Sequence, residues 1–193
     1  YTSNRGLDLL RREIQTYVYK KYNVEYEYST DILITVGGSE AIDATIRAIV
    51  NPGDEVILQT PNWPDYKGQI DMVNATAVWC NVDEKNGFKM TADLIEPLIT
   101  EKTKLIIVNS PSNPTGTSID PEELARIHQV VQARGGFTIV DEIYLGLSYD
   151  AAFGRSALAI SEDIISINSF SKYFNMTGWR LGWMVVPQTM VPV

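Results

Sequence analysis

The chain has 193 residues, of which 45% are hydrophobic and 21% charged, enough apolar material for the core of one globular domain. A formal net charge of -8 argues against nucleic acid as a partner, because phosphate backbones are bound by clustered Lys and Arg. No apolar run approaches the ~20 residues that cross a bilayer and no signal segment opens the chain, so a cytoplasmic protein without membrane contact is expected. Cys80 and His128 are the only residues of their kinds, so neither a disulfide nor a metal site is expected. The expected partner is a small molecule.

Hydrophobic periodicity predicts an alternation of helices and strands along the chain. The first half is predicted as a helix over 7–22, a strand over 31–36, a helix over 39–50, a strand over 55–59, a helix over 64–73 and a strand over 76–82. Gly37-Gly38 and Asn86-Gly87 are predicted to be turns. The second half is predicted as a strand over 105–108, a helix over 121–133, and strands over 137–140, 164–167 and 181–186.

Two features of the second half favour a parallel sheet. The uninterrupted apolar run 105–108 is typical of a strand covered on both faces, which is the habit of parallel sheets. Asp120-Pro121 is a strong helix start, with a side-chain acceptor at the N-cap and proline at the first helical position. The pattern predicts a three-layer α/β/α sandwich with a mostly parallel sheet. In such folds the ligand crevice lies at the carboxyl ends of the strands.

Four polar segments directly follow predicted strands and are therefore the candidates for that crevice. They are Gly37-Gly38-Ser39-Glu40, the segment 109–113, the segment 141–144 and Ser169-Phe170-Ser171-Lys172. Taken singly, Asn113-Pro114-Thr115-Gly116 fits an ordinary turn, and Lys172 with Arg180 fits solvated surface charges. The order in which these segments occur carries more information than any one of them.

The segments TVGGSEA, PNWPDY, NSPSNPTGT, DEIY and SFSKYFNMTGWRLGW, in this order, resemble the class I/II aminotransferases of fold type I. The resemblance covers essentially the whole chain and implies pyridoxal 5'-phosphate as cofactor. It implies that Lys172 is the catalytic lysine that forms a Schiff base with the cofactor and moves the substrate proton, work that a desolvated lysine does best. Asp141 is implied to keep the pyridine nitrogen protonated, and Asn113 with Tyr144 to hydrogen-bond the phenolic oxygen.

The resemblance also implies which residues hold the ring and the phosphate. Trp63 stacks on one ring face, unless it is simply a core tryptophan, and Ile143 lies on the other face. Gly38, Ser39 and Glu40 offer backbone amides to the phosphate at a helix N-terminus. The Glu40 side chain is expected to point outward, because its charge repels phosphate. Ser169 and Arg180 are implied to complete the phosphate site.

Three wider expectations follow from the resemblance. Tyr1 and Gly6 match a segment whose tyrosine reaches the phosphate of the neighbouring subunit, which implies a homodimer, although an untethered terminal residue is usually frayed. Residues 1–193 match the large cofactor-binding domain, with the family's N-terminal arm and C-terminal small domain, which carries the arginine for the substrate carboxylate, expected to lie outside them.

The implied reaction is transfer of an amino group between an amino acid and a 2-oxo acid, impaired in a chain that lacks those parts. Two alternatives stay open at this point. One is another reaction of the same cofactor, β-elimination or racemisation. The other is a non-catalytic regulatory domain that binds the cofactor, which the lack of a basic helix-turn-helix segment disfavours.

Overall fold

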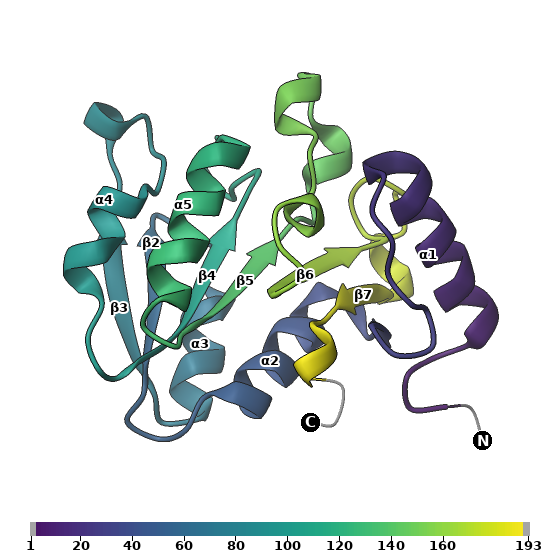
Figure 1. The fold of residues 1–193 in the computed structure, drawn as a ribbon, viewed down its shortest axis with the longest axis horizontal. Helices are drawn as coiled ribbons and strands as arrows, with labels where there is room; N and C mark the ends of the chain where they lie inside the picture. The colour runs from purple at the N-terminus through teal and green to yellow at the C-terminus, as the bar shows by residue number, and fades with distance from the viewer. Residues whose placement is uncertain (1–2, 191–193) are drawn as a thin grey trace.

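A seven-stranded sheet forms the centre of the molecule, with strand order β1-β7-β6-β5-β4-β2-β3 (Figure 1). The computed structural model describes residues 3–190. The strands are β1 Ile32–Thr35, β2 Glu55–Thr60, β3 Thr76–Asn81, β4 Thr103–Asn109, β5 Phe137–Asp141, β6 Ile164–Ser169 and β7 Gly182–Val185. Neighbouring strands pair in parallel except at β7, which is antiparallel to both β1 and β6. The mostly parallel sheet predicted from the sequence is confirmed.

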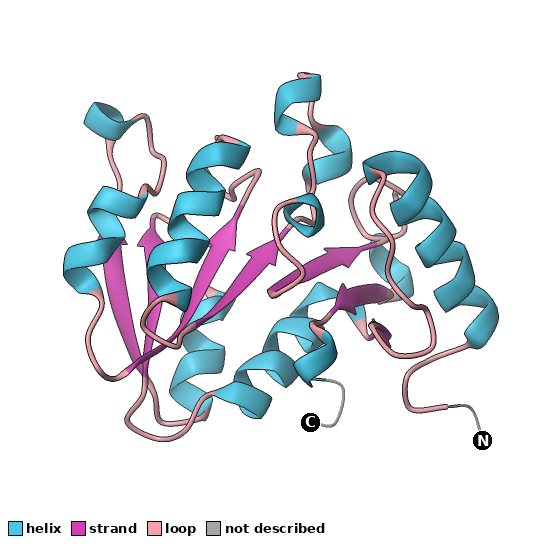
Figure 2. Ribbon diagram, viewed as in Figure 1, coloured by secondary structure: helices cyan, strands magenta, loops and turns pink. Residues whose placement is uncertain are grey.

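Helices cover both faces of the sheet (Figures 1 and 2). They are α1 Asp8–Tyr22, α2 Gly37–Ile49, α3 Asp65–Met72, α4 Ala92–Ile95 and α5 Pro121–Gln132. Core contacts place α2 and α3 on one face and α1, α4 and α5 on the other. This arrangement is the predicted three-layer sandwich. The short helix α4 was not predicted, because four residues are too few to show a helical period. No helix within residues 3–190 is long and apolar enough to cross a membrane.

The apolar runs of the central strands are buried on both sides because the pleat sends successive side chains to opposite faces. Leu58 packs in the core under α2 and α3, whereas its neighbour Ile57 packs under α4 and α5. The same alternation separates Ile107 from Ile106 in β4. The strands thus contribute apolar side chains to the core on both faces of the sheet, and polar side chains gather at the strand ends.

The N-terminus of α2 differs from the prediction, because the helix begins at Gly37 rather than at Ser39. Gly37 has φ +74°, and a Cβ at this position would lie 2.5 Å from Arg180 Nη2. A Cβ on Gly182 would lie 2.6 Å from the carbonyl carbon of Gly37, so the start of β7 lies backbone against backbone on α2. Gly37 is required by its positive φ, and Gly182 is required by this backbone contact, which joins residues far apart in the sequence.

Helix α5 starts where the sequence predicts it, but the hydrogen bond expected from the N-cap side chain is not formed. The Asp120 side chain caps no backbone N–H of the helix, and it lies 3.9 Å from Lys89 Nζ instead. Glu123, in the first turn, accepts a hydrogen bond from the N–H of Ala92 at the start of α4. The carboxylates of Asp120 and Glu123 therefore contact residues distant in the sequence. The feature that agrees with the prediction is proline at the first helical position.

His128 on α5 provides a test of the packing between α5 and the sheet. Its side chain is buried, with Nδ1 3.0 Å from the Thr138 hydroxyl, and burial lowers its pKa. The unfolded chain therefore binds a proton near pH 6.5 that the folded chain does not, and stability falls as the pH drops below that value. We expect His128→Asn to flatten this loss between pH 7.5 and 5.5, as measured by urea unfolding. An unchanged slope would mean that His128 is protonated in the folded protein.

Candidate cofactor site

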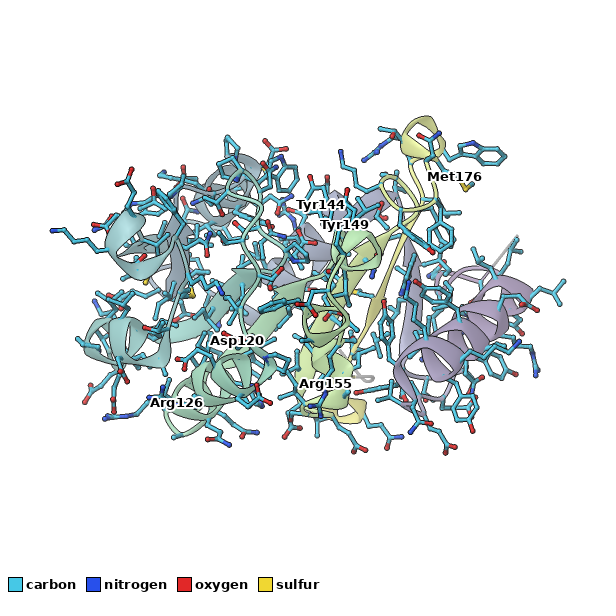
Figure 3. All side chains as sticks on the ribbon, turned by 90° about the horizontal axis from the view of Figure 1, so that it is seen from above. Asp120, Arg126, Tyr144, Tyr149, Arg155 and Met176 are labelled. Atoms are coloured by element: carbon cyan, nitrogen blue, oxygen red, sulfur yellow. The ribbon has the colours of Figure 1, made fainter. Side chains whose placement is uncertain are left out.

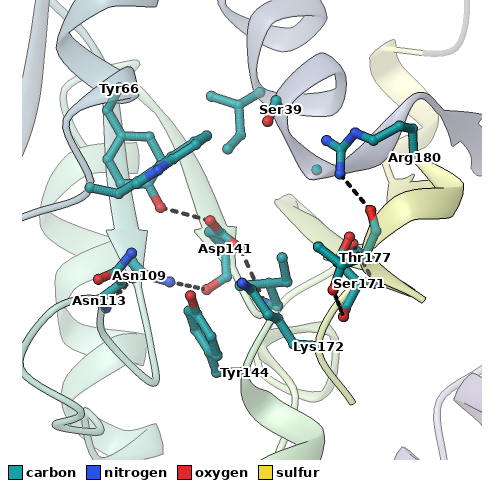
Figure 4. Close-up of a pocket in the computed structure, with 15 residues that line it drawn as sticks. Ser39, Tyr66, Asn109, Asn113, Asp141, Tyr144, Ser171, Lys172, Thr177 and Arg180 are labelled. Atoms are coloured by element: carbon teal, nitrogen blue, oxygen red, sulfur yellow. Dashed lines mark hydrogen bonds between the residues drawn. The ribbon is translucent and has the colours of Figure 1, made fainter. Parts of the chain in front are cut away.

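A pocket of about 180 Å³ opens at the carboxyl ends of the strands, on the face covered by α2 and α3 (Figure 4). It collects side chains from each of the four polar segments that follow predicted strands. The predicted residues that line it are Gly38, Ser39, Trp63, Asn113, Asp141, Ile143, Tyr144, Ser169, Lys172 and Arg180. Parallel pairing explains this convergence, because β2, β4, β5 and β6 all end at the same edge.

Two predicted residues are not among those that line the pocket. The Glu40 side chain is exposed and accepts a hydrogen bond from the Val36 N–H, outside the pocket. This outward orientation is the one expected from its charge. Tyr1 lies outside the described residues, so its predicted reach to a neighbouring subunit stays a prediction. Gly6, of the same segment, has φ +94°, and a Cβ there would lie 2.4 Å from Ile34 Cβ, which explains glycine at this position without a cofactor.

Asp141 forms one end of the pocket. It ends β5 and is only 6% exposed, and burial raises the pKa of its carboxyl group. Tyr66 donates a 2.6 Å hydrogen bond to Oδ2, and the Ile143 N–H donates a 3.1 Å hydrogen bond to Oδ1. Within residues 3–190 no Lys or Arg side chain pairs with this carboxylate. A buried carboxylate that faces a pocket and has no cationic side chain as its partner is suited to bind a cationic group of a ligand.

The next residue, Glu142, points to the opposite face of the sheet. Its carboxylate accepts hydrogen bonds from the hydroxyls of Ser156 and Ser166 and from the N–H of Ala157. Burial raises the pKa of this carboxyl group, and the hydrogen bonds oppose the shift. Glu142 ties the segment before β6 to the sheet, whereas Asp141 keeps acceptor capacity toward the pocket.

The other end of the pocket is rich in donors. The Arg180 guanidinium lies over Gly37 at the N-terminus of α2, and its Nη1 donates to the Thr177 carbonyl at 3.1 Å. The free backbone amides and the dipole of a helix N-terminus favour an anion. Ser39 lies in the same helical turn as Gly38, and the Gln69 side chain of α3 donates to its carbonyl. An arginine and a helix N-terminus at one place fit a phosphate group.

Hydroxyl groups between these two ends are held by the turn that follows β6. Ser169 is fully buried and accepts a 2.9 Å hydrogen bond from the Ser171 N–H. Thr177 donates a 2.9 Å hydrogen bond to the Ser171 carbonyl. These bonds place Ser169, Ser171 and Thr177 along one wall of the pocket.

Lys172 extends from this turn into the space between Asp141 and Tyr144 (Figure 4). Its Nζ lies 5.8 Å from the centroid of the Tyr144 ring. No described residue accepts a hydrogen bond or an ion pair from this amine, and the residue is exposed. The desolvation expected for Lys172 is therefore not supplied by residues 3–190 of one chain.

Trp63 and the asparagines define the remaining wall. The Trp63 and Tyr66 rings meet edge to face at 5.2 Å, so Trp63 belongs to the pocket as well as to the margin of the core. Asn109 joins two strand ends, because it donates to the Asp141 carbonyl at 3.0 Å and accepts from the Asn113 N–H at 2.6 Å. Asn113 is thereby held beside Asp141.

Sequence reasoning missed Ile42, Tyr66, Asn109, Ser171 and Thr177 among the residues that line the pocket. Tyr66 carried a usable signal, since it stands three residues after Trp63 in the segment PNWPDY. Asn109 and Ser171 lie within segments already singled out. Thr177 faces the pocket because the chain folds back after Lys172, which no local pattern predicts.

Together the fold and the pocket define a class of proteins, α/β sandwiches with an exposed lysine between a buried carboxylate and a helix N-terminus that lies beside an arginine. The model of the family Aminotransferase class I and II matches residues 1–192. The chain belongs to this family.

Known relatives agree with this membership. A protein of Bacillus subtilis (strain 168), named "Probable N-acetyl-LL-diaminopimelate aminotransferase", is 41% identical over 188 residues, which are 97% of this chain and 48% of that protein. The aspartate aminotransferase of Geobacillus stearothermophilus is 34% identical over 99% of this chain and 49% of its own length. The structure of N-succinyldiaminopimelate aminotransferase from Mycobacterium tuberculosis superposes with a TM-score of 0.92 at 36% identity, covering 100% of this chain and 51% of that one. The chain spans about half the length of these relatives.

The buried Asp141 carboxylate should cost stability in the absence of a ligand. Because its pKa is raised on folding, the folded chain binds a proton more tightly, and stability is lost as the pH rises from the unfolded value of about 3.9 through the folded one. We expect Asp141→Asn to stabilise the ligand-free protein at pH 7 by on the order of 1 kcal/mol, and less at pH 4. Urea unfolding measures this. Asp71→Asn, at an exposed carboxylate, is the control and should stay within about 0.5 kcal/mol.

Proposed function

We propose that this chain binds pyridoxal 5'-phosphate and that the whole protein transfers an amino group between an amino acid and a 2-oxo acid. The observation that carries the proposal is one pocket with Asp141 at one end, Arg180 and the start of α2 at the other, and Lys172 between them. The names of the relatives support the same reaction class. When bound, the cofactor supplies an aldehyde and a protonated pyridine ring that withdraws electrons from the reacting carbon.

Asp141 is the residue proposed to hold the ring nitrogen. An ionised carboxylate there stabilises a protonated ring nitrogen, which compensates the cost of burying the charge. Tyr66 and the Ile143 N–H fix the orientation of the carboxylate through both of its oxygens. Burial raises the pKa of Tyr66 well above its usual value, so the phenol keeps its proton and remains a donor to Asp141.

The donor-rich end is proposed to hold the phosphate. Arg180, the amides of Gly38, Ser39 and Glu40, and the Ser169 hydroxyl make up the predicted donors. The Ser171 hydroxyl adds a donor that the sequence did not indicate. Trp63 and Ile143 are proposed to cover the ring faces, and Asn113 and Tyr144 to hydrogen-bond its oxygen.

Lys172 is proposed to anchor the cofactor covalently and then to carry a proton to and from the substrate α-carbon. A lysine amine attacks an aldehyde or takes up a proton only in its neutral form, which burial beside other cations favours, and it returns the proton from the ammonium form. Within residues 3–190 Lys172 is exposed, so the cover has to come from elsewhere in the assembled protein. The proposed homodimer, with Tyr1 at the partner's phosphate, is one such source. A cytoplasmic location is proposed with it.

The decisive experiment is a covalent map of the attachment site. Pyridoxal 5'-phosphate is added to the purified protein, the adduct is reduced with borohydride, and the labelled peptide is identified. We expect the label on Lys172, and we expect Lys172→Ala to lose it. A label on another lysine, or none, contradicts the proposed site. Product analysis with several amino acids and a 2-oxo acid then separates amino transfer from β-elimination and racemisation.

A second measurement tests the phosphate end. We expect Arg180→Lys to weaken the affinity for pyridoxal 5'-phosphate roughly tenfold or more, because a point charge replaces the planar fork of the guanidinium. Affinity is read from absorbance titration. Arg155→Lys is the matched control, since Arg155 is exposed and does not line the pocket (Figure 3), and it should leave the affinity unchanged. Wild-type affinity in Arg180→Lys would place Arg180 outside the phosphate site.

A further inference from the structure

The ring of Tyr173, the residue after Lys172, is held between two distant parts of the chain. A Cβ on Gly146 would lie 2.6 Å from Tyr173 Cγ and 2.7 Å from Cδ2, so the Gly146 backbone lies directly against the ring. On α1, Lys21 Nζ lies 4.4 Å from the ring centroid, within the range of a cation–π interaction. The ring therefore joins α1, the turn after Tyr144 and the segment that carries Lys172.

The neighbouring aromatic residues dock the same segment on α1. Phe174 lies 5.1 Å from Phe170 and 5.8 Å from Tyr17 of α1, measured between ring centroids. Phe170 in turn lies 4.8 Å from the buried Trp183 of β7. Lys172 is thus flanked by aromatic side chains that pack away from the pocket, whereas its own side chain lines the pocket.

Only the main chain of Lys172 is fixed by hydrogen bonds within residues 3–190. The Asn175 N–H donates to the Lys172 carbonyl at 3.0 Å, and the Met176 N–H donates to the Phe170 carbonyl at 3.0 Å. These two bonds close a short turn. The orientation of this turn relative to the pocket depends on its contacts with other parts of the chain. Within the turn, Tyr173 is the residue that contacts the segment carrying Tyr144.

Gly146 is what allows this contact. It stands in a 3-10 turn, Leu145–Leu147, in which the Leu147 N–H donates to the Tyr144 carbonyl at 2.9 Å. Gly146 is not among the glycines with positive φ, so the backbone conformation itself accepts alanine. Glycine is required here by the Tyr173 side chain, whose ring atoms lie at 2.6 and 2.7 Å and whose Cβ lies at 3.1 Å, and the contact sets the spacing between the segments that carry Tyr144 and Lys172.

We propose that Tyr173 is a positioning residue, which directs Lys172 toward Tyr144 and Asp141 through its contact with Gly146. The inference rests on the proposed role of Lys172, and it adds a specific device that sets the reach of this lysine. Two observations carry it, the lack of room for a Cβ at Gly146 and the placement of the Tyr173 ring between that backbone and Lys21.

The first experiment is a double-mutant cycle on stability, without cofactor. Gly146→Ala should lower the folding equilibrium constant roughly tenfold or more, because the added methyl group displaces the ring. In a Tyr173→Ala background the same substitution should cost much less, because the ring atoms at 2.6 and 2.7 Å are gone and only the Cβ of residue 173, at 3.1 Å, stays close. Tyr173→Phe is the matched control and should preserve the full penalty, since the ring remains.

The second experiment measures the reach of Lys172. The probe is pyridoxal 5'-phosphate trapped with borohydride. The rate of labelling at Lys172 is divided by the rate at Lys102, an exposed lysine that directly precedes the amino end of β4. We expect this ratio to fall roughly tenfold in Gly146→Ala and in Tyr173→Ala, and to fall no further in the double variant. Tyr173→Phe should keep the ratio within about twofold of the wild type.

Three results would overturn the proposal. An equal penalty for Gly146→Ala in the Tyr173→Ala background would show that the ring does not mediate the effect. A stability coupling with an unchanged labelling ratio would show that Tyr173 only packs. An unlabelled Lys172 in the unmodified protein would overturn the proposed function itself, and this is seen before any variant is made.

Discussion

Parallel pairing of the strands is the constraint on which the site depends. Because β2, β4, β5 and β6 run in one direction, the segments that follow them meet at one edge of the sheet, although they are far apart in the sequence. Polar side chains inside the strands, such as Thr138 and Ser166, are already engaged in hydrogen bonds with buried partners. The polar groups of the protein that need a defined position are therefore placed where the strands end, between α2 and the turn after β6.

The pleat of β5 gives two adjacent buried carboxylates different tasks. Asp141 faces α3 and the pocket, where Tyr66 and one backbone N–H hold it. Glu142 faces the other side, where two serine hydroxyls and a backbone N–H satisfy it. Only the first is left with a charge that a ligand can neutralise. We therefore expect a cost in stability at the position where a cationic group is proposed to bind, as is common at functional sites.

Close backbone contacts determine how two parts of the pocket are built. At the end proposed to bind phosphate, Gly37 and Gly182 let β7 lie directly against the start of α2, with Arg180 beside them. Beside Lys172, Gly146 makes room for the Tyr173 ring. In each case a missing side chain, rather than an added contact, sets the distance between two functional segments. Lys172 and Arg180 line the pocket but are exposed to solvent. Residues 3–190 of one chain therefore form the inner walls of the pocket and do not cover its entrance.

The sequence alone determined the alternation of helices and strands, the mostly parallel sheet and the segments that form the pocket, because these follow from hydrophobic period and local turn chemistry. It also indicated Lys172, Asp141 and Arg180, through the order of their motifs. It could not indicate the antiparallel placement of β7 between β1 and β6, the start of α2 at Gly37, or the side-chain partners of Asp120 and Asp141. Those features depend on contacts between residues distant in the chain. Only the folded structure brings such residues within reach, and a local pattern carries no information about their distance.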